Sequence, residues 1–472
     1  MNAHETPDPQ AAGAVTAEGI AERQRRLFRT DATRSLEFRK RQLRALRQCL
    51  VDNEADILDA LKRDLGRPPA EAYTSDIGIV LIEIDMALKH LARWARPKRV
   101  RTPWLLLPGS SRLVSEPFGS ALVIGPWNYP LNLVLAPAVA ALAAGNCVVI
   151  KPSELAPATS AVMARMIGAA FDPDVLAVIE GGVEPTQALL AQDFDYVFFT
   201  GGTRIGKIVM AAAAEHLTPV TLELGGKNPC IVAADADMKV AARRIAWGKF
   251  FNAGQTCIAP DFVLVERAAQ SQLTEALKAA ITEFYGEDPA ASADYARIVN
   301  ERHFDRLAGF LGRGRVVAGG QTDRASRYIA PTVIADVSWD DPVMADEIFG
   351  PVLPVIACDD LAAEAAALRE RPKPLALYVF SSDTKWADGI VGTLSSGGAA
   401  VNDVFAQMLN MDLPFGGVGA SGMGAYHGKS GFDTFSHHRA VVRRATWFDP
   451  KLRYPPYTLP LAALKQAMAR LM

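Results

Sequence analysis

Short apolar runs alternate with helical segments between residues 120 and 224. The expected strands span residues 121–125, 147–150, 176–180, 196–200 and 220–224. The helices expected between them span residues 131–144, 158–170, 185–191 and 205–215. Strands that are apolar at nearly every position are buried on both faces, and their alternation with helices is typical of a parallel sheet covered by helices. The pattern predicts a doubly wound α/β domain, which binds ligands at the carboxyl ends of its strands.

The same alternation restarts after Gly225. Further helices are expected at residues 237–250 and 272–284, and further strands at 262–265, 328–334, 352–356 and 376–379. A chain of 472 residues is long enough for about three domains. We therefore expect an α/β protein with two doubly wound parallel-sheet domains.

The segments outside these domains are expected to be helical or extended. Apolar residues recur at three- and four-residue steps in residues 16–95, which indicates amphipathic helices. Residues 97–117 place Pro and Gly between two short arms and predict a protruding hairpin, with which the extended run 440–443 is expected to pair. The apolar residues 104–107 lie at the turn of this hairpin, and an exposed apolar patch usually marks a contact surface.

The two ends of the chain carry no catalytic signature. Residues 1–18 lack the basic start and apolar core of a signal peptide and predict a loose leader. Residues 459–472 predict a short amphipathic helix, which either packs on a partner or makes weak contact with a membrane surface. The longest apolar run, 131–145, is shorter than the roughly 18 residues that a spanning helix needs, so no transmembrane segment is expected.

Composition excludes several classes of protein. Lys and Arg total 50 against 52 Asp and Glu, so the formal net charge is −2, and neither nucleic-acid binding nor disorder is favoured. The five cysteines are scattered and form no Cys-x-x-Cys pair, which argues against a disulfide scaffold and against a zinc site. We expect no metal site, and we expect a reducing compartment, the cytoplasm.

Two motifs follow expected strands and favour a dinucleotide. Gly201, Gly202, Thr203 and Gly206 follow one strand and open a helix, where backbone N–H groups and the helix dipole favour an anion. The spacing differs from the usual dinucleotide fingerprint, so a plain tight turn is an equal alternative. The run 151–154 ends another strand, and its Lys151 and Glu154 could meet a ribose or form a surface ion pair.

Three further residues are candidates for catalysis. Cys257 lies among small and polar residues at a turn rather than in an apolar strand, and a thiolate is a strong nucleophile toward a carbonyl carbon. Glu223 ends a strand and could be a general base or pair with Lys227. Asn128 could donate to an oxyanion or cap the helix that follows it.

Seven motifs, in this order, resemble the NAD(P)-dependent aldehyde dehydrogenase superfamily. They are PWNYP at 126–130, KPSE at 151–154, FTGG at 199–202, ELGGK at 223–227, GQTC at 254–257, EIFGP at 347–351 and PFGG at 414–417. The resemblance runs from about residue 20 to residue 445. The runs after Cys257 and from Gly422 to His437 are similar to the class-three branch, which includes fatty-aldehyde and coniferyl-aldehyde dehydrogenases.

This resemblance implies a mechanism. Cys257 attacks the aldehyde, Asn128 holds the oxyanion, hydride leaves for the nicotinamide, and Glu223 activates the water that hydrolyses the thioester. The cofactor is NAD or NADP. The residues implied to bind it are Lys151, Glu154, Gly201, Gly202, Thr203, Gly206, Glu347 and Phe349, and Trp127, Tyr129 and Phe415 are expected either to line a pocket for apolar or aromatic aldehydes or to pack in the core.

The resemblance also implies domain roles and an assembly. Residues 1–96 and 117–223 would form a Rossmann-like cofactor domain, 224–422 a catalytic domain, 97–116 and 423–446 a small β oligomerisation element, and 447–472 a tail. The expected partners are a small-molecule aldehyde and a second copy of the chain in a homodimer. A cofactor-free thiol hydrolase and a non-catalytic nucleotide-binding protein are the alternatives.

Overall fold

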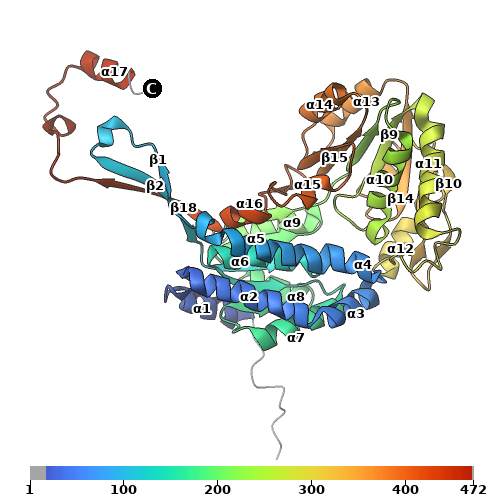
Figure 1. Cartoon of the computed structure of the whole chain (residues 1–472), viewed down its shortest axis with the longest axis horizontal. Helices are drawn as coiled ribbons and strands as arrows, with labels where there is room; N and C mark the ends of the chain where they lie inside the picture. Colours follow the sequence, from blue (N-terminus) through green and yellow to red (C-terminus); the bar gives the residue numbers. More distant parts are fainter. Residues whose placement is uncertain (1–16, 470–472) are drawn as a thin grey trace, which may run out of the picture.

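The computed structural model describes residues 17–469. The described part of the chain begins with helices (Figure 1). They are α1 (Ala17–Phe28), α2 (Leu36–Asp52), α3 (Glu54–Leu65), α4 (Pro69–Ala72) and α5 (Gly78–Trp94), with the π-helical turn η2 (Tyr73–Ile77) between α4 and α5. This confirms the helical start. Most of the expected leader, residues 1–16, lies outside the described residues, as do residues 470–472.

The first sheet contains six strands in the order β17-β7-β6-β3-β4-β5. Its parallel strands are β3 (Ser120–Ile124), β4 (Cys147–Lys151), β5 (Leu176–Val178), β6 (Tyr196–Thr200) and β7 (Val220–Glu223). The connecting helices are α6 (Asn132–Ala144), α7 (Pro157–Ala170), α8 (Val183–Leu190) and α9 (Thr203–Ala214). Helix α1 packs with α8 and α9 on one face of this sheet, and α2, α3 and α5 pack with α6 and α7 on the other. The short strand β17 (Gly422–Met423) adds an antiparallel edge beside β7.

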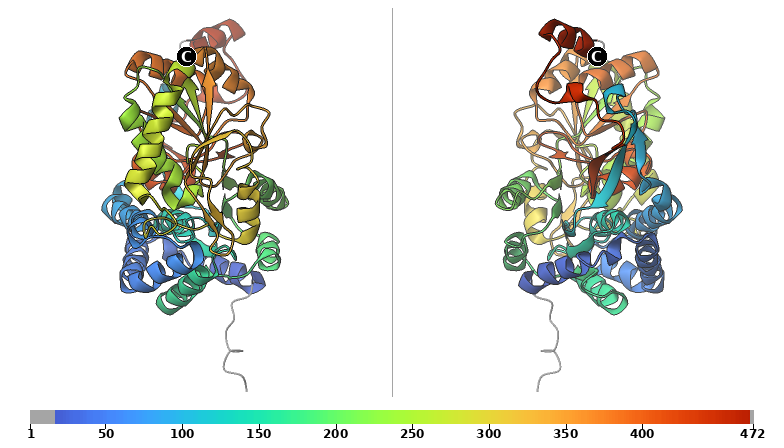
Figure 2. Two further views of the ribbon diagram at one scale, coloured as in Figure 1. Left: turned by 90° about the vertical axis from the view of Figure 1, so that its right-hand side faces the viewer. Right: turned by 90° about the vertical axis from the view of Figure 1, so that its left-hand side faces the viewer.

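The second sheet contains seven strands in the order β10-β13-β14-β9-β8-β15-β16. The parallel strands are β8 (Pro229–Val232), β9 (Phe262–Glu266), β13 (Thr332–Ala335), β14 (Val352–Cys358), β15 (Ala376–Phe380) and β16 (Gly398–Val401), while β10 (Arg315–Ala318) is an antiparallel edge. Helices α10 (Met238–Phe250), α11 (Arg267–Tyr285), α13 (Leu361–Ala367) and α14 (Thr384–Thr393) cover it (Figure 2). The two sheets confirm the predicted α/β class with two parallel-sheet domains.

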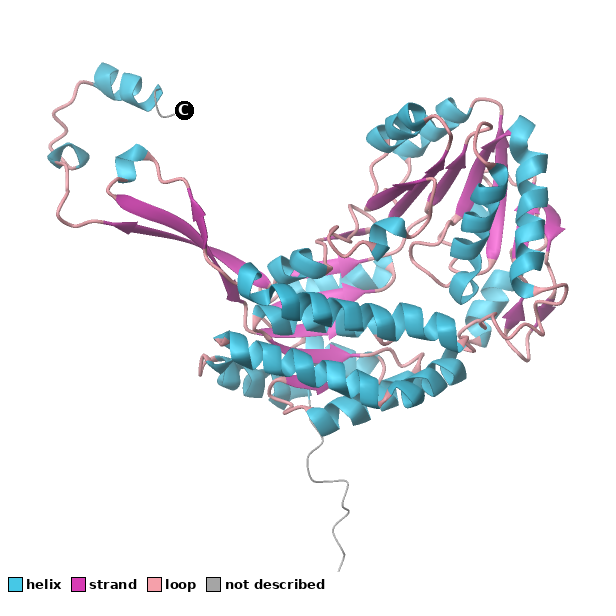
Figure 3. Ribbon diagram, in the orientation of Figure 1, coloured by secondary structure: helices cyan, strands magenta, loops and turns pink. Residues whose placement is uncertain are grey.

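A third sheet projects from the body. Strands β1 (Lys98–Val100), β2 (Gly109–Pro117) and β18 (Ser436–Arg444) form an antiparallel sheet in which β18 pairs with the whole of β2 (Figure 3). The expected pairing of the hairpin with a late extended run is therefore present. The C-terminal strand of the small sheet begins at Ser436, later than the expected residue 423. The residues before it form α16 (Gly428–Thr434), which packs on α5 and α6 and buries Phe432 beside Trp94.

The tail continues beyond this sheet. After β18 the chain forms the short turn η7 (Lys451–Arg453) and the helix α17 (Leu461–Ala469), which lies near the hairpin and away from both large sheets (Figure 1). Trp447 and Leu461 are exposed in it. Among the described residues, no helix combines the length and the apolar composition that crossing a bilayer requires.

Candidate active site

The turn before Cys257 has a left-handed backbone. After α10 the chain passes through Asn252, Ala253 and Gly254 with φ of 52°, 50° and 73°. A Cβ on residue 254 would lie 2.3 Å from the carbonyl oxygen of Gly350, so only glycine fits there. Asn252 and Ala253 adopt the same region without that freedom, and such strain persists only where surrounding contacts hold it.

Hydrogen bonds tie this turn to the loop after β3. The Asn128 side-chain amide donates to the Gln255 carbonyl at 3.0 Å, and the Asn252 amide donates to the Asn128 carbonyl at 2.9 Å. Asn128 does not cap α6, because the Leu131 and Asn132 N–H groups of that helix start donate to Asp76. The Asn128 Oδ1 atom is therefore left without a partner, and the amide nitrogen uses one N–H for the Gln255 carbonyl, which leaves the second N–H for a ligand.

Burial sets the state of the Cys257 thiol. Desolvation, followed by the Glu347 and Glu223 carboxylates, raises its pKa above the ordinary value, while the backbone N–H groups of Cys257 and Ile258 oppose the rise. The side chain is partly accessible, whereas the four other cysteines of the chain are buried. In the chain alone, Cys257 is thus a protonated thiol at neutral pH.

Glu223 ends β7 and is buried with no hydrogen bond to either carboxylate oxygen. Burial raises its pKa well above the ordinary range. Glu223 does not form the alternative ion pair with Lys227. The Lys227 ammonium group instead pairs with Asp261 at 2.5 Å and donates to the carbonyls of Val343 and Asp346. A buried carboxyl group without a hydrogen-bond partner therefore lies at the end of this strand.

A cavity of about 880 Å³ lies between the carboxyl ends of strands of the first sheet and the loops that precede β9 and β14 of the second sheet. Cys257 and Glu223 lie in its wall together with the predicted residues Trp127, Asn128, Gly201, Gly202, Glu347 and Phe349. Trp127 was expected in the aldehyde pocket, but the structure places it here, edge-on to Phe349 with ring centroids 5.3 Å apart. We call this space the cofactor-side cavity.

The glycine turn at the start of α9 is shaped by packing. A Cβ at residue 201 would lie 2.5 Å from the Phe199 ring, and a Cβ at residue 206 would lie 2.7 Å from Leu224. Gly202 begins α9 and has open space around it, and Thr203 donates to the Ala420 carbonyl at 3.3 Å. The start of this 12-residue helix thus opens onto the cavity with no side chain in the way.

Lys151 and Glu154 lie at the end of β4, outside the walls of that cavity. The Lys151 ammonium group is buried and donates to the Pro152 carbonyl at 2.5 Å, and burial lowers its pKa. Glu154 is half exposed and lies 3.8 Å from Lys151. Lys151 is the last residue of β4, the strand beside β3, and Glu154 follows it, so both lie at the strand end that the sequence predicted.

Glu347 and Phe349 face the cofactor-side cavity from the loop before β14. A Cβ at residue 225 would lie 2.0 Å from a Glu347 carboxylate oxygen, so glycine at that position makes room for the carboxylate. Burial, then Asp261, raises the Glu347 pKa to about 8, and one of its oxygens has no partner. Phe349 has a φ of 50°, a second strained position at this site.

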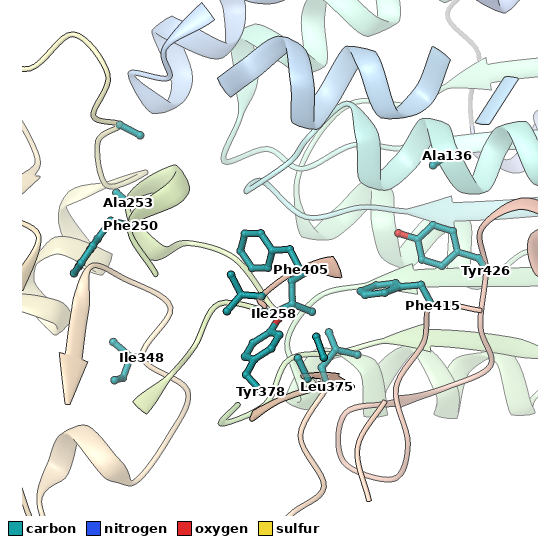
Figure 4. Packing of buried hydrophobic residues seen from close by; sticks show 14 of the residues in the cluster. Ala136, Phe250, Ala253, Ile258, Ile348, Leu375, Tyr378, Phe405, Phe415 and Tyr426 are labelled. Carbon is teal, nitrogen blue, oxygen red and sulfur yellow. Dashed lines mark hydrogen bonds between the residues drawn. The ribbon is translucent and has the colours of Figure 1, made fainter. Parts of the chain in front are cut away.

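A second cavity, of about 760 Å³, opens on the other side of Cys257. Tyr129 and Phe415 line it, as predicted, and the Tyr129 hydroxyl lies 2.5 Å from that of Thr256. Sequence reasoning missed most of its other wall residues: Thr74, Ser75, Ile79, Leu133, Trp247, Phe251, Ile258, Phe405, Met408, Leu409, Tyr426 and His427. Figure 4 shows Phe405 close to Ile258, and Phe415 close to Tyr426. We call this space the apolar cavity.

The missed wall residues come from five separate stretches of the chain. Trp247 and Phe251 lie four residues apart at the end of α10, and their rings pack with 5.8 Å between centroids. That spacing was the one signal available in the sequence, because it puts two aromatic rings on one helix face. In the cofactor-side cavity, His303 and Arg306 were also missed.

Comparison with known proteins decides between the alternatives. The model of the aldehyde dehydrogenase family matches residues 2–441. The chain belongs to the aldehyde dehydrogenase family. It is 48% identical to mouse (Mus musculus) aldehyde dehydrogenase family 3 member B2 over 459 residues, which are 97% of this chain and 96% of that protein.

Two further similarities come from Staphylococcus aureus. The dehydrogenase is 47% identical to 4,4'-diaponeurosporen-aldehyde dehydrogenase of strain NCTC 8325 over 432 residues, 91% of this chain and 94% of that protein. The solved substrate-bound state of S. aureus AldH superposes with a TM-score of 0.94 at 45% identity and covers 96% of this chain and 100% of that chain.

The chain is therefore an NAD(P)-dependent aldehyde dehydrogenase, which oxidises an aldehyde to the carboxylic acid. Its cofactor-side cavity fits a nicotinamide dinucleotide: the bare glycine turn gives an anion access to a helix start, and one buried Glu347 oxygen lacks a partner. The cofactor-free hydrolase and the non-catalytic protein are thereby set aside.

The raised pKa of Cys257 gives a measurable reactivity. We expect alkylation of the cofactor-free dehydrogenase by iodoacetamide to be slow at neutral pH and to accelerate well into the alkaline range, because only the thiolate reacts. Glu347→Gln should move the profile of rate against pH to lower pH, since it removes a carboxylate that opposes thiolate formation. Cys257→Ala is the control for reagent taken up elsewhere. A profile centred near the ordinary thiol pKa in the wild type would contradict this account.

Proposed function

We propose that Cys257 is the nucleophile that attacks the aldehyde carbon. The observation that carries this proposal is that Cys257 lies in the walls of both cavities. An aldehyde in the apolar cavity and a cofactor in the other would meet at its sulfur. The Cys257 thiol first loses its proton to water. Its sulfur then forms a bond to the aldehyde carbon while the π pair of the carbonyl bond moves to the oxygen, which carries the negative charge of the thiohemiacetal anion.

In this proposal Asn128 stabilises that oxygen. Its amide is held by the bond to the Gln255 carbonyl and keeps one N–H free on the cavity side of the Cys257 loop. Removal of one such donor lowers turnover by roughly 10²–10³-fold in enzymes that use an oxyanion site. An amide suits the task because it is uncharged and does not neutralise the thiolate.

Glu223 acts as the base for the second half of the reaction. A nicotinamide held in the cofactor-side cavity would supply the acceptor for the hydride of the thiohemiacetal carbon, and Cys257 would then carry a thioester. Glu223 takes a proton from water, which attacks the thioester carbon; the carbon–sulfur bond breaks, and the acid leaves with regeneration of the thiol. A carboxyl group whose pKa is raised can accept that proton and release it again.

The cofactor would be held at both ends of its cavity. Gly201, Gly202, Thr203 and Gly206 form the proposed pyrophosphate turn, and Glu347 and Phe349 the proposed contacts to the nicotinamide ribose and ring. Lys151 and Glu154 are the proposed contacts to the adenosine ribose. We propose use of both NAD and NADP, because the exposed Glu154 can turn away from a 2′-phosphate that Lys151 would then neutralise.

The substrate class follows from the walls of the apolar cavity. Aromatic and aliphatic side chains dominate the lining, and Tyr129, Phe415 and Phe405 contribute rings. Such a surface favours medium- or long-chain aliphatic or aromatic aldehydes. The relative named for 4,4'-diaponeurosporen-aldehyde supports an apolar aldehyde for this chain as well.

An assay for reduced cofactor tests both claims. We expect reduction of NAD by the wild type to be most efficient, by kcat/KM, with apolar aldehydes of at least medium length or with an aromatic ring, and least efficient with short polar ones. Cys257→Ala should abolish turnover with all of them while cofactor affinity changes by less than about threefold. Turnover by the correctly folded variant would exclude Cys257 as the nucleophile.

Glu223→Gln separates the two halves of the reaction. We expect a burst of reduced cofactor equal to about one per active site, followed by a steady state at least about 100-fold slower than in the wild type, because the base acts after the hydride has left. The wild-type steady-state rate should rise with pH over a range above that of an ordinary carboxyl group, because burial raises the pKa of the Glu223 carboxyl. That rise should be absent from the variant. Unchanged burst and steady state would leave Glu223 without a role.

We propose that two copies of the chain associate through the projecting sheet. Trp104 and Leu105 at the tip of the hairpin are 59% and 51% exposed, and water contact with such side chains is unfavourable. The sheet also has β1 and β18 as its edges, and an edge strand can pair with another chain. The proposed domain roles follow: the six-stranded sheet binds cofactor, the seven-stranded sheet carries Cys257, and the three-stranded sheet mediates assembly.

Light scattering after gel filtration tests the homodimer. The wild type should have the mass of two chains at micromolar concentration, and the double variant Trp104→Glu/Leu105→Glu the mass of one. Leu217→Glu is a matched control, because Leu217 is 92% exposed and lies after α9, away from the hairpin. A monomeric wild type, or a dimer unaffected by the hairpin variant, would contradict the proposal.

We also propose that the enzyme works in the cytoplasm. The structure pairs none of its five cysteines in a disulfide, and Cys257 must stay reduced to act as a nucleophile. The weak membrane contact of the tail stays a prediction.

A further inference from the structure

A cluster of charged residues lies behind the apolar cavity, in a segment whose sequence shows no catalytic motif. Arg67 is completely buried, and its guanidinium group contacts Asp76, Ser75 and Glu71. Asp76 is buried as well. Taking such charges out of water is costly unless each is paired and hydrogen-bonded. The further contacts of these residues therefore indicate which parts of the molecule the cluster holds in place.

Asp76 contacts the element that follows Asn128. Its second carboxylate oxygen accepts from the Leu131 N–H at 3.1 Å and the Asn132 N–H at 3.0 Å. These groups are the free donors at the start of α6, where a negative charge is favourable. Asp76 therefore holds the start of α6, and with it the loop that carries Asn128, at a set distance from Arg67.

Glu71 contacts the turn that precedes Cys257. Its carboxylate accepts from the Asn252 backbone N–H at 2.8 Å. Asn252 is the first of the left-handed residues, and its side chain donates to the Asn128 carbonyl. Glu71 thus supports the strained turn from the side opposite Asn128. Desolvation raises the Glu71 pKa to about 7, against the opposing effects of the Arg67 charge and the Asn252 N–H.

Arg67 itself contacts the third part of the site. Its guanidinium carbon lies 4.8 Å from the centre of the Tyr129 ring, an attractive cation–π arrangement. The Tyr129 hydroxyl bonds to Thr256, the residue before Cys257. The π-helical turn η2 (Tyr73–Ile77) makes this convergence possible, because it puts Ser75 in the wall of the apolar cavity while Asp76 reaches α6.

We propose that Arg67, Glu71 and Asp76 form a positioning cluster that holds the Asn128 loop and the Cys257 turn at the spacing required for oxyanion stabilisation. The cluster spans both loops through three independent contacts, and none of its three members lines either cavity. They act through Asn128, Tyr129 and Asn252 rather than on the substrate. The inference rests on the roles proposed above for Asn128 and Cys257.

Glu71 offers the sharpest test, because two uncharged variants of similar volume differ in whether their side chain can accept a strong hydrogen bond. Glu71→Gln keeps an oxygen that can accept from the Asn252 N–H, and Glu71→Met does not. The measurement is the rate of the first-turnover burst of reduced cofactor with an aromatic aldehyde, together with cofactor affinity, aldehyde KM and thermal midpoint. We expect Glu71→Met to slow the burst about 100-fold, the effect of misplacing a catalytic group by about 1 Å, and Glu71→Gln to stay within about threefold of the wild type.

The same variants should leave binding almost unaltered. Cofactor affinity and aldehyde KM are expected within about twofold of the wild type in both, since no residue of the cluster lines either cavity. Asp59→Ala is the matched control: it removes a carboxylate of the same N-terminal helices that pairs with Arg63 at the surface, and its burst should equal that of the wild type. Equal burst rates in the Met and Gln variants, fast or slow, would overturn the proposal.

A further variant covers the case in which Glu71→Met does not fold. Tyr129→Phe keeps the ring against Arg67 and removes the hydroxyl that reaches Thr256; we expect a burst about tenfold slower, and an unchanged burst would overturn the proposal. Cys257→Ala, measured alongside, reports on the function itself. A burst retained in Cys257→Ala would refute the proposed nucleophile, whereas a difference between the two Glu71 variants concerns the cluster alone.

Discussion

The exchange of hydrogen bonds between Asn128 and the turn before Cys257 connects the two halves of this enzyme. One residue follows a strand of the first sheet, the other precedes a strand of the second, and their side chains and carbonyls bond to each other. The turn is left-handed at Asn252 and Ala253, a conformation that such residues adopt only when their surroundings compensate for it. The location of Cys257 between two cavities depends on these bonds.

Burial gives the site its resting state. Cys257, Glu223 and Glu347 all have raised pKa values, with desolvation as the first cause in each. Burial thus favours the neutral forms of the Glu223 and Glu347 carboxyl groups and of the Cys257 thiol, which lowers the repulsion that buried anions at this site would have. An enzyme that needs a thiolate and later a carboxylate can generate each when ligands fill the cavities and change the surroundings of these groups.

Much of the architecture is readable from the residues alone. Runs that are apolar at every position predicted strands such as β3 and β6, because a parallel sheet covered on both faces needs no polar side. The sequence predicted the strands of the second sheet less completely. The single strand expected at residues 328–334 is divided into β12 (Tyr328–Ile329) and β13, since Pro331 has no N–H to donate to a ladder. Strands β10 and β16, one partly exposed and one rich in small residues, were not predicted.

The sequence by itself predicted the chemistry proposed for this protein, because in that proposal the chemistry depends on the types of a few residues near strand ends: Cys257, Glu223, Asn128 and the glycine turn before α9. For side chains without such a local signal, only the tertiary structure decided the direction in which they point. Trp127 turned to the cofactor side while Tyr129, two residues on, faces the apolar cavity. The sequence placed Arg67, Glu71 and Asp76 in a solvated helical start. In the structure they are bonded to one another and to the loops that carry Asn128 and Cys257. The physical reason is that a buried charge is stable only beside its partners. Arg67 finds two of them nearby in the chain, but the backbone N–H groups that Asp76 and Glu71 bind lie 55 to 181 residues away.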